Sequence, residues 1–368
     1  MIEMDVERLR SVGLTPAMAL VAICSQPVPE TDETEATGAP RCLVRVTEVH
    51  RETLQVHDGQ HESSARVLPR LARSLLDQDT AVAVGDWVVL VRDPHGQAWV
   101  HERIAPLTHI ARRDADGRRH PVVSNVDTAL LVMGLDDDFN PRRLERFLAL
   151  VQGQGVTPVV VLTKADVVTP DRVDAAIAEL RTRIAPQVEV VAVNGTQPAT
   201  TRVLDPYLEP GQTVVLLGSS GAGKSTLTNA LAGAALQDTG AVREHDSRGK
   251  HTTTSRSLHR LPGGACVIDT PGLRTLRPDA DESTLTASFE DIASLAIHCR
   301  FRDCRHGDEP GCAVREGVSP DRLRNYQKLL REVRRDTLTV LERQQITSEW
   351  KARGRAANLR LKMKRGEV

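Results

Sequence analysis

The sequence contains few aromatic residues, which make up only 2% of its 368 positions. Proteins that grip single-stranded nucleic acid by base stacking rely on aromatic side chains, so stacking is not the expected main activity of this chain. Long apolar runs are missing as well: no stretch approaches about 18 apolar residues without a charge, so we expect no membrane partner. The acidic start at Met1–Asp5 leads into no signal-like apolar core, and we therefore expect a cytoplasmic protein.

Charge of one sign is not in excess either, because 48 Lys and Arg residues face 49 Asp and Glu residues. Net charge therefore gives no argument for binding a polyanion, and any basic surface must be local. Six cysteines are too few for a disulfide scaffold in this length, and in a reducing compartment clustered thiols indicate metal binding or catalysis. The composition is that of an ordinary globular protein, and we expect a monomer with about two or three domains.

The pattern of apolar residues changes along the chain, which predicts a multidomain protein. Residues 1–40 predict an N-terminal helix and a linker rich in proline and acidic residues. Residues 41–112 contain about five short runs of period two, which predict a small β-barrel, OB-like by preference with an SH3-like barrel as the alternative. Residues 113–280 predict a doubly wound α/β domain, and residues 281–368 combine a cysteine cluster, a helical pattern and a basic tail.

The α/β segment alternates buried apolar runs with helical stretches. Strands are expected at 128–133, 156–162, 188–193, 213–217 and 265–268. Helices are expected between them, at 141–152, 172–184 and 224–232.

The clearest motif is a phosphate-binding loop, G-x-x-x-x-G-K-S, placed between a predicted strand and a predicted helix. The motif is formed by Gly218, Ser219, Ser220, Gly221, Ala222, Gly223, Lys224 and Ser225, and we expect Thr226, which follows it, to bind the nucleotide as well. The glycines let backbone N–H groups turn toward a phosphate, and the start of the helix adds its positive dipole end. We expect Lys224 to reach the β- and γ-phosphate oxygens and to act in catalysis, and the Ser225 hydroxyl to ligate Mg²⁺.

A second magnesium element follows later in the chain, where the strand predicted at 265–268 ends in Asp269-Thr270-Pro271-Gly272. A strand that ends in Asp-x-x-Gly can hold Mg²⁺ through the carboxylate and sense the γ-phosphate through the glycine amide. We therefore expect Asp269 to bind the metal and both Asp269 and Gly272 to bind the nucleotide.

A base-recognition motif comes directly after another predicted strand, as Thr163-Lys164-Ala165-Asp166. This run resembles the N/T-K-x-D motif by which GTPases recognise guanine. An aspartate at the base edge accepts hydrogen bonds from the N1 and N2 hydrogens of guanine, which adenine does not offer, and the lysine stem packs on the ring. Thr163 stands where asparagine is commoner, so one polar contact is weaker or replaced.

The order of these motifs is informative. In most GTPases the base motif follows the phosphate loop, whereas here it precedes it. A second base-side loop is expected after the next strand, and Val193-Asn194-Gly195 fits that place without the usual Ser-Ala. The sequence therefore predicts a circularly permuted GTPase domain, in which the end of switch two leads directly into the C-terminal domain.

Four potential metal ligands cluster near the C-terminus in the pattern C-x4-C-x-H-x5-C. They are Cys299, Cys304, His306 and Cys312. Three thiolates and one imidazole complete a tetrahedral Zn²⁺ site with no open position, which predicts one structural zinc ion per chain. Arginines interleaved with the ligands suit contact with phosphate groups: Arg300, Arg302 and Arg305.

Together these motifs resemble the ribosome small-subunit-dependent GTPase A family over nearly the whole chain. Further matching segments are Gly85-Asp86-Trp87, Asn125-Val126-Asp127, Gly249–Thr254 and Asn325-Tyr326. The resemblance implies that the chain binds GTP and GDP. It also implies GTP hydrolysis coupled to late maturation of the small ribosomal subunit, stimulated by that subunit and with its rRNA as partner. Thr163 and the loop at 193–195 depart from the family pattern.

The residue after the Asp-x-x-Gly motif is Leu273, where many GTPases carry a glutamine that orients the attacking water. Leucine has no polar group, so another residue must position the water, and His251 is the best candidate by type and by place in the presumed switch one. A neutral imidazole can accept a hydrogen bond from the water. The alternative is that His251 is an exposed loop residue. One of the threonines at 252–254 is expected to ligate Mg²⁺, and we choose Thr253.

The sequence thus predicts a GTPase that uses Mg²⁺ with GTP, carries structural zinc and docks on rRNA through the barrel, the zinc region and the basic tail at 351–368. Two other classes remain as alternatives. An RNA-binding scaffold with a degenerate nucleotide domain is disfavoured by the intact Lys224 and Asp269. An ATP-dependent P-loop enzyme is disfavoured by the Thr163–Asp166 motif.

Overall fold

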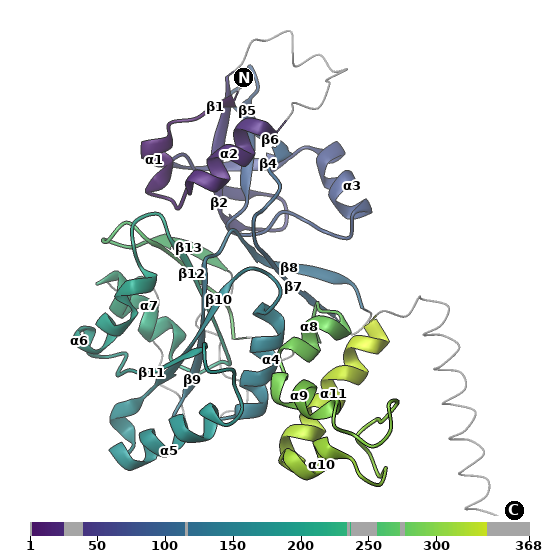
Figure 1. The fold of residues 1–368 in the computed structure, drawn as a ribbon. Coiled ribbons are helices and arrows are strands. Elements are labelled where there is room, and N and C mark those ends of the chain that lie inside the picture. Colours follow the sequence, from purple (N-terminus) through teal and green to yellow (C-terminus); the bar gives the residue numbers. More distant parts are fainter. Residues whose placement is uncertain are drawn as a thin grey trace, which may run out of the picture.

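The computed structural model describes residues 2–25, 40–114, 117–233, 236, 256–272 and 277–336. Figure 1 shows an N-terminal barrel above an α/β domain, with a helical C-terminal domain beside the α/β domain. Most of the predicted linker, at 26–39, lies outside the described residues. Within the described part of the chain, no helix has the length and apolar character needed to cross a membrane.

Five strands close the N-terminal barrel. They are β2 (Arg41–Val49), β3 (Leu54–His57), β4 (Glu62–Val67), β5 (Trp87–Arg92) and β6 (Ala98–Arg103). The long strand β2 pairs with both β3 and β5, and a bulge between Val46 and Glu48 bends it across these two neighbours. β4 and β6 complete the ring as a parallel pair, and helix α3 (Pro69–Asp77) lies between β4 and β5. This connectivity is that of an OB-like barrel, the preferred prediction.

The N-terminal segment contains two short helices where the sequence predicts one. Its elements are β1 (Ile2–Glu3), α1 (Val6–Arg10) and α2 (Pro16–Cys24). The helices separate at Gly13, whose φ of +87° lies in the left-handed region that favours glycine. Thr15 then starts α2 by accepting a hydrogen bond from the Met18 amide at 3.2 Å. The buried side of α2 packs on the floor of the barrel around Trp87.

The α/β domain has a sheet in the order β11-β10-β9-β12-β14-β13. Its strands are β9 (Thr128–Gly134), β10 (Thr157–Thr163), β11 (Glu189–Ala192), β12 (Thr213–Gly218), β13 (Ser257–Arg260) and β14 (Cys266–Asp269). The pairs are parallel except for β13, which is antiparallel to β14 and also touches β2 of the barrel. The carboxyl ends of β9, β10, β12 and β14 therefore meet at one edge, where ligands bind in such sheets.

Helices cover both faces of this sheet, as a doubly wound domain requires. They are α4 (Pro141–Val151), η2 (Ala165–Val167), α5 (Pro170–Arg181), α6 (Pro198–Thr201), η3 (Arg202–Tyr207) and α7 (Lys224–Ala232). Neighbouring residues of one strand point to opposite faces. Leu131 joins the core that contains residues of α4 and α5, whereas Leu130 joins the core that contains residues of α7.

A small sheet and a helical domain complete the described chain. Their elements are β7 (His109–Arg113), β8 (Arg119–Ser124), β15 (Arg277–Pro278), α8 (Glu282–Ala287), α9 (Glu290–Ala296), α10 (Ala313–Gly317) and α11 (Pro320–Asp336). Glu145 of α4 is only 2% exposed and accepts hydrogen bonds from Arg322 at 2.8 Å and Arg183 at 3.2 Å. Because removing one partner of a buried ion pair is costly, this cluster fixes α11 to α4.

Arg45 of β2 ties the barrel to the α/β domain. Its buried guanidinium donates hydrogen bonds to Val12 O at 2.5 Å, Thr213 Oγ1 at 2.9 Å and Asn125 O at 2.8 Å. It also lies over the ring of Trp87, 5.3 Å from the centroid. Arg45 therefore connects the N-terminal segment, strand β12 and Asn125, which lies just before strand β9.

The segments Gly85–Trp87 and Asn125–Asp127 of the family resemblance meet at the same junction. A Cβ at Gly85 would lie 2.1 Å from the carbonyl oxygen of Ser124, so this contact requires glycine. The Asn125 side chain donates to the Gly85 carbonyl at 3.0 Å. These matches therefore belong to the interface between barrel and α/β domain.

We predict that Arg45→Met destabilises the protein by roughly 3 kcal/mol, because it leaves buried oxygen acceptors without their donor. The measurement is the midpoint of urea unfolding. Arg41→Met is the matched control on the same strand, since Arg41 forms a partly exposed ion pair with Glu102 at 3.3 Å. Such pairs contribute less than about 1 kcal/mol. Equal shifts of the midpoint in both variants would contradict the role given to Arg45.

Candidate nucleotide and zinc sites

The phosphate loop closes around its own lysine. The Lys224 ammonium donates to the carbonyl oxygens of Ser219 at 2.7 Å and Gly218 at 3.2 Å, and the residue is 7% exposed. Burial lowers the pKa of Lys224, and the nearby carboxylates of Asp269 and Asp138 oppose that effect. A desolvated ammonium interacts strongly with phosphate oxygens, because charges attract more strongly where water is excluded.

Glycines allow neighbouring backbone to press against this loop. A Cβ at Gly272 would lie 2.4 Å from the Ser220 amide nitrogen, which places the glycine of the Asp-x-x-Gly motif directly against the phosphate loop. A Cβ at Gly218 would lie 2.4 Å from the Val132 carbonyl oxygen of β9. Real Cβ atoms do not approach backbone atoms so closely. Both positions therefore require glycine, because each one touches the backbone of a neighbouring segment.

Thr163, the departure from the usual base motif, lies under the phosphate loop. Its side chain is buried, and its hydroxyl donates to the Ala222 carbonyl oxygen at 2.6 Å. A Cβ on Gly223 would meet this hydroxyl at 3.2 Å. Thr163 thus links the end of β10 to the phosphate loop, and this contact is the polar interaction that the structure assigns to it.

The next residues of the base motif become progressively less buried, and Asp166 is exposed. Lys164 adopts a left-handed backbone with φ of +60°, and its ammonium pairs with Asp136 at 2.6 Å. Although partial burial acts in the opposite direction, the bond from Lys164 lowers the pKa of Asp136. Ala165 and the exposed Asp166 lie in the short turn η2, beside the loop after β11, where the Ala165 amide donates to Val193 O at 3.4 Å.

The loop after β11 has its own internal structure. The Asn194 side chain accepts hydrogen bonds from the amide of Thr196 at 2.9 Å and from its hydroxyl at 2.6 Å. A Cβ at Gly195 would contact Thr226, which directly follows the phosphate-loop motif, at 3.5 Å. The structure therefore brings the loop at 193–195 beside both the base motif and α7.

Sequence reasoning missed Asp138, which also contacts the phosphate loop. Its carboxylate accepts a hydrogen bond from the Ser219 hydroxyl at 2.6 Å and pairs with Arg143 of α4. Asp136 and Asp138 both follow β9, and polar residues directly after a parallel strand are the signal that indicates this position.

The predicted magnesium ligands have the right chemistry at this edge of the sheet. Asp269 is fully buried at the end of β14, and Ser225 lies in the first turn of α7. A hydroxyl and a carboxylate are oxygen ligands of the kind that Mg²⁺ prefers. Behind the metal motif, the Thr270 hydroxyl donates to the Leu216 carbonyl at 2.6 Å, which fixes the turn after β14. His251, Thr253 and Leu273 lie outside the described residues.

The four predicted zinc ligands come together in one place. The Sγ, Sγ, Nδ1 and Sγ atoms of Cys299, Cys304, His306 and Cys312 all lie within 4.8 Å of one another. His306 Nδ1 is 3.6 Å from the sulfurs of Cys299 and Cys312, which are 4.0 Å apart. Ligands of a tetrahedral zinc ion lie about 3.5–3.8 Å apart, so these residues fit the ion.

Local backbone geometry supports this cluster. His306 has a φ of +58°, which turns its ring back toward the cysteines, and Gln327 of α11 donates to its carbonyl at 2.9 Å. Cys312 also caps α10 by accepting from the Arg315 amide at 3.4 Å. The cluster therefore connects the loop at 299–312 to both α10 and α11.

We predict that the purified protein carries one zinc ion per chain, and that Cys304→Ala combined with Cys312→Ala abolishes this binding. Two of four ligands cannot close a tetrahedral site. The measurement is elemental analysis of the folded protein, with Cys24→Ala as control because Cys24 is exposed and outside the cluster. Full zinc occupancy in the double variant would show that these residues do not hold the metal.

Sequence comparison identifies relatives that align with most of this chain. A protein named small ribosomal subunit biogenesis GTPase RsgA, from Xanthomonas oryzae pv. oryzae, is 46% identical over 307 residues. The alignment covers 80% of this chain and 82% of that relative. The protein of the same name from Xanthomonas axonopodis pv. citri is 45% identical over 304 residues, with the same coverage.

Solved structures show the same fold at lower sequence identity. YjeQ from Thermotoga maritima has a TM-score of 0.56 and 23% identity, and covers 80% of this chain and 98% of its own. YloQ, described as a circularly permuted GTPase, has a TM-score of 0.54 and 22% identity, over 86% of this chain and 100% of its own. The model of the RsgA GTPase family matches residues 101–278. The chain therefore belongs to the RsgA GTPase family.

Proposed function

We propose that this protein hydrolyses GTP to GDP and phosphate in the cytoplasm, during late maturation of the small ribosomal subunit, and that the subunit and its rRNA stimulate hydrolysis. One observation carries the proposal: the phosphate loop, the Asp-x-x-Gly turn and the base motif, which are far apart in the chain, meet at one edge of the sheet. The names of the relatives support the biological setting.

The site residues divide the work by chemistry. Backbone amides of residues 218–226 and the Lys224 ammonium bind the phosphates, and Ser225, Thr253 and Asp269 hold the Mg²⁺ that neutralises them. Thr163 supports the loop from below, and Asp166 accepts hydrogen bonds from the guanine edge. Gly272, in contact with Ser220, is placed to report whether a γ-phosphate is present.

His251 takes the place of the glutamine that orients water in many GTPases. Leu273 cannot orient water, and an imidazole in the segment before the metal-binding threonine can accept a hydrogen bond from it. On this proposal, the ribosomal subunit supplies the stimulation by placing His251 close to the γ-phosphate.

We predict that Lys224→Ala lowers GTP hydrolysis by about 10²-fold or more, because it removes a fixed positive charge from the developing phosphate charge. The measurement is phosphate release with and without purified small subunits, with the exposed Arg202→Ala variant as control.

We predict that the His251→Ala variant binds GTP with the affinity of the parent and loses the stimulation of GTP hydrolysis by the small subunit. Equal hydrolysis of ATP would favour a P-loop ATPase, and absence of any nucleotide binding would favour a scaffold.

A further inference from the structure

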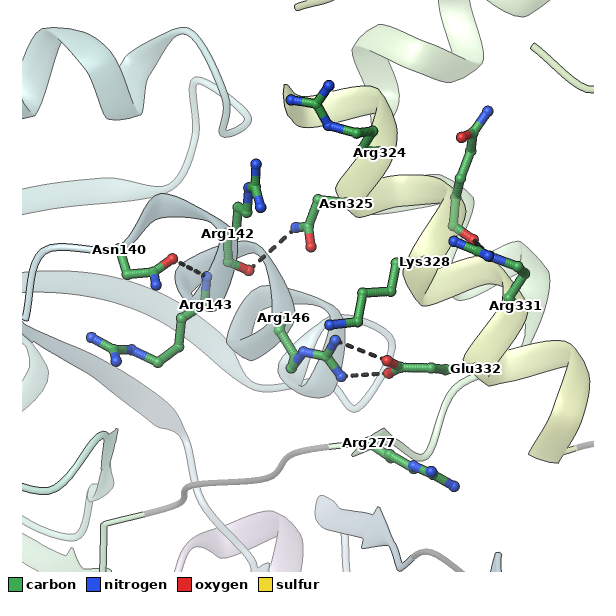
Figure 2. Close-up of a pocket in the computed structure, with 11 residues that line it drawn as sticks. Asn140, Arg142, Arg143, Arg146, Arg277, Arg324, Asn325, Lys328, Arg331 and Glu332 are labelled. Atoms are coloured by element: carbon green, nitrogen blue, oxygen red, sulfur yellow. Dashed lines mark hydrogen bonds and ion pairs between the residues drawn. The ribbon is translucent and has the colours of Figure 1, made fainter. Parts of the chain in front are cut away.

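A basic cleft lies between the α/β domain and the helical domain. It has a volume of about 700 Å³ and is formed by the start of α4, by α11 and by Arg277 of β15 (Figure 2). None of the three predicted sites includes it: it lies outside the phosphate loop, the base motif and the zinc cluster. Its positively charged side chains are Arg142, Arg143, Arg146, Arg277, Arg324, Lys328 and Arg331.

Positive charge exceeds negative charge in this cleft. Glu332 is the single carboxylate among the lining residues, and it pairs with Arg146, one of their bonds measuring 3.1 Å. Asp321 lies nearby and is shared by Arg142 and Arg183, with the latter at 3.3 Å. Asp138 pairs with Arg143, and Asp321 also lies 3.8 Å from Arg324. Seven cationic residues of the cleft thus face three carboxylates, so the net charge is positive and would attract an anion.

Helical periodicity produces the basic wall on α11. Arg324, Lys328 and Arg331 follow the spacing i, i+4 and i+7, which places them on one face of the helix, and all three are exposed. Tyr326, on another face of the helix, is buried in the core of the helical domain. Figure 2 shows the Lys328 side chain extending across the cleft toward Arg146 of α4.

Two amide side chains of the cleft donate hydrogen bonds within the protein. They stabilise the walls of the cleft and are not used to recognise the bases of a nucleic acid. Asn325 donates to the Arg142 carbonyl at 3.2 Å, and Gln327 donates to the His306 carbonyl of the zinc loop. The lining contains no aromatic residue on which a base could stack. Cations on two rigid helices, without stacking or base-edge groups, suit the regularly spaced phosphates of a nucleic acid backbone.

We propose that the α4–α11 cleft binds the sugar–phosphate backbone of RNA. The inference rests on the proposed function, because the ribosomal subunit supplies that RNA. The cleft also borders the nucleotide site: Arg143 pairs with Asp138, whose carboxylate accepts a hydrogen bond from Ser219 of the phosphate loop. Arg277 follows the Asp-x-x-Gly motif closely in the chain, so RNA in the cleft would contact the segment after switch two.

The test measures binding of the full-length protein to a short fluorescent RNA duplex and to purified small subunits over a range of salt concentrations. Lys328→Gln combined with Arg331→Gln should weaken binding to both by about 10-fold or more. It should also reduce the slope of log K against log salt by about 1 for each lost phosphate contact. Glu332→Gln, which releases Arg146 and removes the carboxylate of the cleft, should tighten binding to both.

The control combines Arg172→Gln with Arg202→Gln, which removes the same charge from exposed positions of the α/β domain outside the cleft. The proposal is overturned if the control weakens binding as much as the cleft variant, or if Glu332→Gln has no effect. Loss of subunit binding with unchanged duplex binding would also overturn it, because the partner would then be a ribosomal protein. Subunit-independent GTP hydrolysis stays at the parent rate in the cleft variants. Absence of GTP hydrolysis by the parent even with purified small subunits would instead refute the proposed function.

Discussion

Backbone atoms press directly against the phosphate loop from neighbouring strand ends, and this contact determines where the nucleotide-binding groups lie. Gly218 touches β9, Gly223 sits on Thr163 of β10, and Gly272 touches the Ser220 amide. A loop held on several sides cannot easily absorb a shift of Gly272. We propose that loss of the γ-phosphate is transmitted through Gly272 to the helical domain.

A buried ion cluster connects the helical domain to the α/β domain. Buried Glu145 of α4 is bound by Arg322 of α11, which also pairs with Asp291 of α9 at 2.6 Å. The zinc loop adds a second link to α11 through the His306 carbonyl and Gln327. The walls of the basic cleft, the zinc cluster and α4 thus form one connected unit next to the phosphate loop.

Apolar patterning and motif spacing were sufficient to predict most of the α/β domain and the zinc ligand set. The predicted strand at 213–217 and helix at 224–232 correspond to β12 and α7, because a run of buried residues and a capping glycine are local signals. Long-range polar contacts could not be predicted in this way. Arg45, Asp138 and Glu145 look like ordinary surface charges in the sequence, and only the fold shows that their partners come from distant elements.

In the permuted site, a base motif that precedes the phosphate loop in the chain must bind the base of the nucleotide whose phosphates the loop holds. Substitution of Asp166 tests this requirement most directly. Asp166→Asn replaces an acceptor with an amide that can donate to O2 of xanthine, where guanine carries an amino group. The measurement is competition between GTP and xanthosine triphosphate for the parent and the variant. We predict that the variant, in which Lys224 and the phosphate loop are intact, loses affinity for GTP and gains affinity for xanthosine triphosphate. An unaltered preference for GTP would contradict the assignment of Asp166 to the base and, with it, the permuted nucleotide site.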